Sequence, residues 1–125
     1  MKKIINTTNA PTPIGPYSQA VMANGVLYSS GQIAINPNNG ELVISSIEEE
    51  TEMVMKNIEA VLTEADLNFT NIVKCSIFIS DMNNFSKINA VYAKYFDENP
   101  PARETVEVAR LPKDVNVEIS FIAVS

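Results

Sequence analysis

The sequence predicts an α+β fold in which two helices cover one face of a mixed β-sheet. Apolar residues alternate with period two in several segments, and they recur at helical spacing in two longer segments between them. The expected order is β-β-α-β-α-β-β, and helices that return the chain between strands by right-handed crossovers lie on one sheet face. The other face keeps apolar positions, so we expect the chain to associate with copies of itself through that face.

The first two strands are predicted at Ser18 to Ala23 and Val26 to Ser30. The dipeptide Asn24-Gly25 joins them, and it is typical of a type I′ turn because both residues tolerate positive φ. A loop is expected at residues 36–40, where the sequence is Asn-Pro-Asn-Asn-Gly. The chain is therefore expected to contain an early β-hairpin.

The first predicted helix begins after Ser46. This serine and Glu49 match a capping box, and apolar residues keep helical spacing from Ile47 to about Ala65. The run Glu48-Glu49-Glu50 is most simply a favourable charge run at the helix N-terminus. One buried stripe on a surface helix is expected.

A third strand and a second helix follow. Ile72 to Ser80 alternates as a strand, and Cys75 falls on its buried side. An apolar and aromatic stripe over residues 85–96 predicts a helix that ends before Asn99-Pro100-Pro101.

The closing segment, residues 103–121, is predicted to be a hairpin. Valines, Ile119 and Phe121 recur there with period two, and residues 111–114 supply a proline-containing turn. Pairing the two apolar faces sets Thr105 opposite Glu118 and Arg103 opposite Ser120. Arg103 and Glu118 are therefore expected to share one polar sheet face.

Composition limits the possible functions. The chain has 125 residues, 46% of them hydrophobic, which fits one domain spanning residues 1–125. No apolar run approaches the roughly 18 residues of a membrane span, and no signal peptide is visible, so we expect a cytoplasmic protein. The formal net charge of -6 argues against general nucleic-acid binding.

The chain has a single cysteine and no histidine. An internal disulfide is therefore impossible, and the usual zinc, haem, Cys-His and Ser-His schemes lack their parts. We expect no metal and no cofactor. Any catalysis must use carboxylates, hydroxyls, arginine, backbone groups and water.

Seven residues offer a donor, an acceptor or unusual backbone at the ends of predicted elements, and each also has a structural interpretation. Arg103 is alternatively a surface or ion-paired cation. Glu118 lies within a strand, where glutamate is depleted and costly to bury unpaired. The others are alternatively packing, turn or solvated positions. The candidates are Tyr17, Ser30, Gly31, Asn89, Arg103, Thr105 and Glu118.

Four segments carry a family resemblance: residues 14–18 (Ile-Gly-Pro-Tyr-Ser), 30–33 (Ser-Gly-Gln-Ile), 101–103 (Pro-Ala-Arg) and 106–115. The chain resembles the RidA (YjgF) family of reactive intermediate deaminases. The resemblance implies a chorismate-mutase-like fold, a homotrimer with a central β-barrel, and three sites in clefts between subunits. It also implies substrates that are 2-imino acids, such as 2-iminobutanoate and 2-iminopropanoate, hydrolysed to 2-oxo acids and ammonia.

By the same resemblance, Arg103 matches the arginine of the deaminase-competent branch, and the other six candidates match positions that line the site. The Arg103 guanidinium is expected to hold the substrate carboxylate through two hydrogen bonds, and Glu118 to orient or deprotonate a water. Backbone groups at Gly31 and Thr105 are expected to guide the nitrogen.

The sequence departs from the family's common pattern at Glu104, Thr105 and Ser120. Glu104 is expected to point away from Arg103, and no thiol stands at position 105. Two alternative functions stay open: an RNA-cleaving or translation-inhibiting protein, and a non-catalytic binder of small carboxylates that acts through protein partners.

Overall fold

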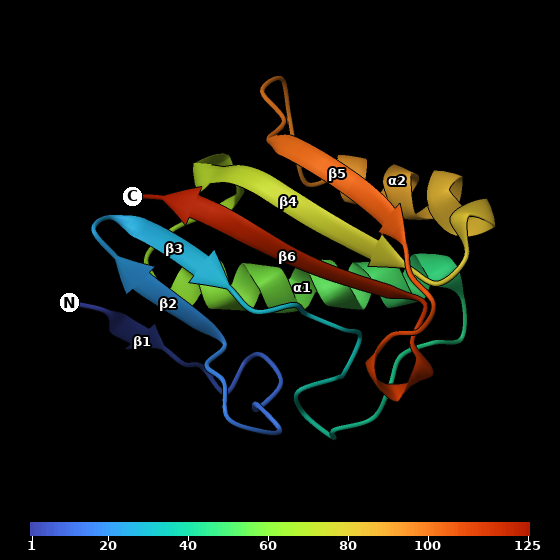
Figure 1. Cartoon of the computed structure of the whole chain (residues 1–125), viewed down its shortest axis with the longest axis horizontal. Helices are drawn as coiled ribbons and strands as arrows, with labels where there is room; N and C mark the ends of the chain where they lie inside the picture. Colours follow the sequence, from blue (N-terminus) through green and yellow to red (C-terminus); the bar gives the residue numbers. More distant parts are fainter.

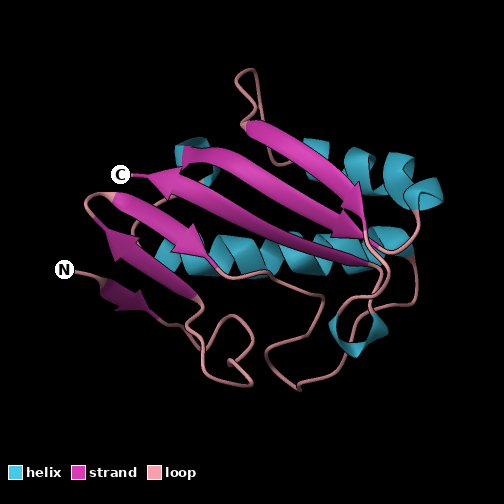
Figure 2. Cartoon of the chain, viewed as in Figure 1, coloured by secondary structure: helices cyan, strands magenta, loops and turns pink.

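Six strands form one mixed β-sheet with two helices against one of its faces (Figures 1 and 2). The computed structural model describes residues 1–125. The strand order across the sheet is β1-β2-β3-β6-β4-β5. The strands are β1 (Lys3–Ile5), β2 (Ala20–Ala23), β3 (Val26–Ser29), β4 (Ile72–Ile79), β5 (Ala102–Glu107) and β6 (Val117–Val124).

The two helices are α1 (Ile47–Glu64) and α2 (Phe85–Ala93), and both lie behind the sheet in Figure 1, as predicted. Helix α1 connects β3 to β4, and α2 connects β4 to β5, so each helix returns the chain to a parallel strand. Three single-turn 3-10 helices complete the chain: η1 (Phe69–Asn71), η2 (Met82–Asn84) and η3 (Pro112–Asp114). Neither α-helix is both long and apolar enough to cross a membrane.

The prediction of a closing hairpin is wrong, because β4 lies between β5 and β6. Strand β4 pairs in parallel with β5 on one side and antiparallel with β6 on the other. Residues 108–116 cross the end of β4, and the Val108 amide donates to the Ile79 carbonyl at 2.9 Å. Alternation with period two indicates the face on which a residue lies, but it does not indicate which strands are neighbours. It therefore cannot predict a third strand between two strands that are close in sequence.

The inserted strand also changes which residues share a face. Arg103 lies level with Cys75 of β4, which lies level with Phe121 of β6. Cys75 and Phe121 are both buried, so Arg103 belongs to the sheet face that the helices cover. Glu118 lies level with Phe78 and belongs to the open face. The predicted pairings of Arg103 with Ser120 and of Thr105 with Glu118 are therefore wrong, and Arg103 and Glu118 lie on opposite faces.

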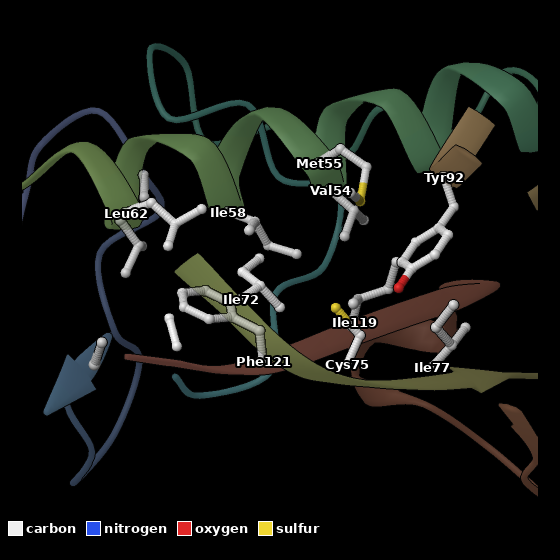
Figure 3. Packing of buried hydrophobic residues seen from close by; sticks show 14 of the residues in the cluster. Val54, Met55, Ile58, Leu62, Ile72, Cys75, Ile77, Tyr92, Ile119 and Phe121 are labelled. Atoms are coloured by element: carbon white, nitrogen blue, oxygen red, sulfur yellow. The ribbon is translucent and has the colours of Figure 1, made fainter. Parts of the chain in front are cut away.

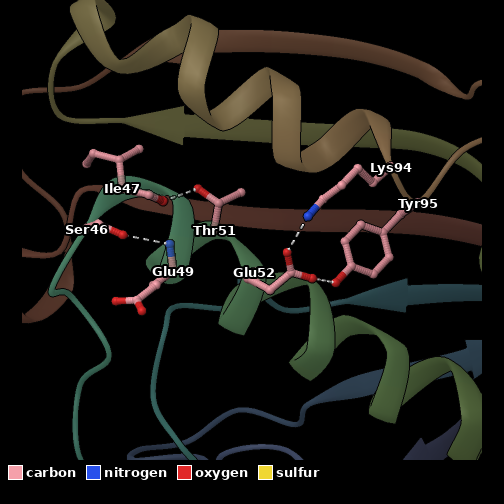
Figure 4. Close-up of polar contacts among 7 residues, drawn as sticks. All are labelled: Ser46, Ile47, Glu49, Thr51, Glu52, Lys94 and Tyr95. Carbon is pink, nitrogen blue, oxygen red and sulfur yellow. Dashed lines mark hydrogen bonds and ion pairs between the residues drawn. The ribbon is translucent and has the colours of Figure 1, made fainter.

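The first hairpin and the start of α1 follow the sequence signals. Asn24 and Gly25 adopt φ values of 51° and 77°, as a type I′ turn requires. The Glu49 amide donates to the Ser46 hydroxyl at 3.1 Å and caps α1 (Figure 4). The capping box is only half formed. The Glu49 carboxylate accepts a hydrogen bond from the Ser45 hydroxyl instead of from the Ser46 backbone amide.

The second helix is shorter than predicted and ends at Ala93. Tyr95 and Phe96 lie beyond it and pack on Phe69, with ring centroids 5.0 and 5.7 Å away. These two aromatic residues are apolar because they pack against η1, and not because the helix continues through them. Strand β1 was not predicted, β2 begins at Ala20 and not at Ser18, and β6 continues to Val124, beyond the predicted end at Phe121. The bounds of β3 and β4 agree with the prediction to within one residue.

The hydrophobic core fills the space between α1 and the central strands (Figure 3). Met55, Ile58 and Leu62 of α1 face Ile77 of β4 and Ile119 of β6, and all five are buried. Cys75 is buried among them, as predicted, and burial raises the pKa of its thiol.

Glu50 departs from the predicted charge run, because it is fully buried in the first turn of α1. Its carboxylate accepts hydrogen bonds from the Asn116 amide (2.7 Å), the Asn116 side chain (2.7 Å) and the Val117 amide (3.2 Å). These donors lie at the point where β6 begins, directly before Glu118. Glu50 therefore fixes the entry of β6 into the sheet.

We expect Glu50→Ala to lower the free energy of unfolding by about 3 kcal/mol or more, since it leaves three N–H donors without their acceptor in the interior. Glu48→Ala is the matched control, because Glu48 is an exposed neighbour in the same turn and its loss should cost less than about 0.5 kcal/mol. Urea unfolding at one protein concentration measures both. Equal stability of the two variants would contradict the role given to Glu50.

Candidate active site

The structure divides the seven candidate residues between two places. Asn89, Arg103 and Thr105 lie together between α2 and the edge strand β5, and are called here the arginine group. A separate cleft at the open face holds the other four candidates and is called the Glu118 cleft. Its candidate residues are Tyr17, Ser30, Gly31 and Glu118.

Arg103 is held in a defined position by α2. Its Nη1 donates to the Asn89 side-chain oxygen at 2.7 Å. Its guanidinium carbon lies 5.5 Å from the centre of the Phe85 ring and 5.1 Å from that of Tyr92. Contacts of this length to two aromatic faces favour a cation. The guanidinium is oriented before any ligand arrives.

The Arg103 guanidinium has no carboxylate partner in this chain. The three ion pairs of the structure are Lys74–Glu104, Lys94–Glu52 and Arg110–Asp114. The alternative of an ion-paired arginine is therefore wrong for the single chain, whereas Arg103 is exposed, as a surface arginine would be. An exposed, oriented guanidinium without a counter-ion is suited to bind a carboxylate through two parallel hydrogen bonds.

Two hydroxyl groups near Arg103 are buried without a hydrogen-bond partner. They are Thr105 Oγ1 and Tyr92 Oη. Burial raises the pKa of Tyr92, which keeps the hydroxyl neutral. Thr105 lines a shallow hollow with Arg103, Phe85 and Met82. A small anionic ligand in this hollow would lie beside the Arg103 cation, while the Thr105 hydroxyl oxygen itself is covered by the chain.

The Glu118 cleft has a volume of about 540 Å³. A Cβ atom placed on Gly31 would lie 2.4 Å from Glu118 Oε2, so only glycine leaves room for the carboxylate there. Tyr17 is 51% exposed at the cleft, which argues against the packing interpretation. The Ser30 hydroxyl donates to the Ser18 carbonyl and ties the cleft wall to the neighbouring chain segment.

Glu118 is the only carboxylate among the residues that line this cleft. Its carboxylate has no hydrogen-bond donor and no cation partner in the chain, and burial raises its pKa above the usual 4.5. A raised pKa moves the carboxylate toward the range in which it exchanges a proton near neutral pH. The group is therefore suited to accept a proton from water.

Sequence reasoning missed Gln19, the side chain that organises one wall of the cleft. Gln19 is buried, and its amide nitrogen donates to the carbonyls of Thr7 (3.0 Å), Ala10 (3.3 Å) and Pro11 (2.9 Å). Its amide oxygen accepts from the Thr7 amide at 2.8 Å. Nothing in the local sequence distinguishes it from an exposed strand glutamine.

Glu104 points away from the arginine group, as predicted. It lies level with Ser76 on the open face, where it pairs with Lys74 at 3.1 Å and accepts a hydrogen bond from Ser76. These donors lower the pKa of the Glu104 carboxyl, the Ser76 bond first. Its charge is engaged there and is not directed at Arg103.

The open face of the sheet carries a continuous apolar row. Ile4, Val21, Tyr28 and Ile122 stand level with one another on β1, β2, β3 and β6. Tyr28 and Ile4 are both 49% exposed. An exposed apolar row of this length in a small protein is typical of an interface.

A family described as Endoribonuclease L-PSP matches residues 7–125 of the chain. Human 2-iminobutanoate/2-iminopropanoate deaminase is 41% identical over 124 residues, which cover 99% of this chain and 90% of the human protein.

Two solved structures are similar over nearly their whole length. YyfA of Yersinia pestis, a Rid family protein of unknown function, superposes with a TM-score of 0.97 at 53% identity, covering 100% of both chains. TdcF of E. coli, solved with bound serine, superposes with a TM-score of 0.94 at 41% identity, covering 98% of both chains.

Proposed function

The chain belongs to the Endoribonuclease L-PSP family, and we infer its function from that membership and from the geometry of the candidate site. We propose that it is a deaminase that hydrolyses reactive 2-imino acids, such as 2-iminobutanoate and 2-iminopropanoate, to 2-oxo acids and ammonia. The observation that carries the proposal is the oriented Arg103 guanidinium without a carboxylate partner. The human relative named for this activity supports it.

Arg103 takes the substrate carboxylate in this proposal. Two parallel hydrogen bonds from the guanidinium fix the plane of the carboxylate and, through it, the plane of the adjacent C=N group. Asn89 and the rings of Phe85 and Tyr92 keep the guanidinium in place. The serine bound to TdcF is a small carboxylate of the expected kind.

Glu118 activates the water. Its carboxylate takes a proton as the water oxygen bonds to the imine carbon, and then returns that proton to the nitrogen. The hydroxyl proton of the tetrahedral intermediate also passes to the nitrogen as the C–N bond breaks, so that ammonia leaves, the C=O group forms and Glu118 is again a carboxylate. The net change is R–C(=NH)–COO⁻ plus H₂O to R–CO–COO⁻ plus NH₃, with no oxidation or reduction. Imines already hydrolyse in water, so the site needs only to position one water and one base.

Arg103 and Glu118 act together only if different copies of the chain supply them. Within one chain they lie on opposite faces of the sheet. A homotrimer in which the open faces form a central barrel buries the apolar row of Ile4, Val21, Tyr28 and Ile122. The arginine group of one copy then faces the Glu118 cleft of the next, and Tyr17, Ser30, Gly31 and Thr105 line the shared site.

RNA cleavage is the second candidate function, because the family description names an endoribonuclease. The net charge of -6 and the lack of histidine count against it. A coupled assay with a threonine dehydratase separates the candidates by following 2-oxobutanoate formation. Binding of 2-oxobutanoate without acceleration would favour the non-catalytic binder.

The shared site is tested by mixing two inactive variants. We expect trimers of Arg103→Lys chains alone, or of Glu118→Gln chains alone, to be nearly inactive. When the two variants are co-expressed one to one, about a quarter of the sites should be active, because one random interface in four joins an intact Arg103 to an intact Glu118. Imine hydrolysis per trimer, with the trimer checked by sedimentation, gives the fraction. No recovery in folded mixed trimers would contradict a site that two copies share.

Arg103→Lys keeps the charge and removes the planar pair of donors. We expect the variant still to bind 2-oxobutanoate but to lose most of the hydrolysis rate, about 10²-fold, because a point charge lets the carboxylate rotate. Thermal unfolding and imine hydrolysis on one preparation measure the two effects. Full activity with reduced stability would show a purely structural arginine.

Glu118→Gln removes the base and keeps the shape. We expect the rate to fall by about 10²-fold or more. Because burial raises the Glu118 pKa above 4.5, the wild-type rate should fall as the pH drops through that raised value, when the carboxylate becomes protonated. A pH profile of kcat/KM, corrected for spontaneous hydrolysis, should lack this acid limb in the variant. The same limb in both proteins would assign the base elsewhere.

A further inference from the structure

Lys113 is the only cation among the residues that line the Glu118 cleft. The other lining residues are neutral, apart from Glu118 itself. The chain's three ion pairs use Lys74, Lys94 and Arg110, so Lys113 has no carboxylate partner. The lining of the cleft therefore includes one lysine that is in no ion pair within the chain.

The position of Lys113 is imposed on the backbone. Lys113 and Asp114 adopt φ values of 57° and 56°, a left-handed conformation that side chains other than glycine, asparagine and aspartate rarely adopt. The surroundings hold this conformation: the Arg110 guanidinium donates to both Asp114 oxygens at 2.6 and 3.2 Å, and Leu111 and Val115 are buried on either side. The loop thus keeps a strained lysine at the cleft wall.

The cleft has more room than a four-carbon substrate needs. Its volume of about 540 Å³ lies within the range of pockets that bind much larger ligands. Ile14, Ile33 and Ile35 line it and offer apolar contact to methylene groups. In the proposed function, the carboxylate next to the imine is held by Arg103, so an anion that meets Lys113 must belong to another part of the substrate.

We propose that Lys113 makes the Glu118 cleft specific for 2-imino acids whose side chain ends in an anionic group, a second carboxylate being the simplest. This inference rests on the proposed function and names the substrate class of that site. The Lys113 ammonium binds the distal carboxylate, while the isoleucine side chains contact the carbons between the two ends.

The test uses two stable product analogues of equal chain length, 2-oxoglutarate and 2-oxopentanoate, which differ only in the distal carboxylate. Titration calorimetry of the assembled protein should show that the wild type binds 2-oxoglutarate more tightly. We expect Lys113→Gln to lower this preference by about fivefold or more and Lys113→Arg to keep it. Lys56→Gln is the matched control, because Lys56 is an exposed lysine of α1 outside the cleft.

The same preference should appear in the rates at which 2-iminoglutarate and 2-iminopentanoate are hydrolysed. The two imines are made in the assay by oxidising the corresponding amino acids, glutamate and 2-aminopentanoate. Equal binding of both analogues, or a preference that Lys113→Gln leaves unchanged in a folded protein, would overturn the inference. Failure of the proposed function gives a different result: the protein would then hydrolyse none of the three imines, 2-iminoglutarate, 2-iminopentanoate and 2-iminobutanoate, faster than buffer does.

Discussion

The place of β4 between β5 and β6 determines where every candidate side chain lies. Side chains alternate between the two faces of a strand, so the pairing of β4 sends Arg103 to the helix side and Glu118 to the open side. A register slip of one residue would exchange the faces of a whole strand. Glu50 counters such a slip at the start of β6, where its buried carboxylate holds Asn116 and Val117.

Much of the fold was predictable, because local signals decide it. The Asn24-Gly25 turn, the Ser46 cap and the apolar stripe of α1 each depend on neighbouring residues alone, and each was confirmed. The prediction of a closing hairpin was wrong because β4 inserts by long-range pairing, which alternation with period two does not indicate. Gln19 and Glu50 were missed for a related reason, since their partners lie far along the chain or in loops.

The two halves of the candidate site leave opposite charges unsatisfied in one chain. Arg103 is oriented by Asn89 but has no anion, and Glu118 is half-buried without a donor or a cation. A half-buried carboxylate such as Glu118 costs free energy unless a donor or a cation completes it, and the exposed Arg103 guanidinium is free to bind an anion. The sequence predicts both side chains as candidates, but it does not predict their separation, which follows from the sheet order.

The departures at positions 104 and 105 have different consequences once the faces are known. Glu104 points to the open face, where Lys74 and Ser76 hold it, so its charge is locally compensated and is directed away from Arg103. Thr105 stays on the side of Arg103, and its hydroxyl is buried without a partner. A hydroxyl can make a hydrogen bond but cannot form a thiolate, so no nucleophilic sulfur chemistry is available at this position. In the proposed function the orientation of the ligand therefore depends on the exposed Arg103 guanidinium, and the proton transfer depends on Glu118.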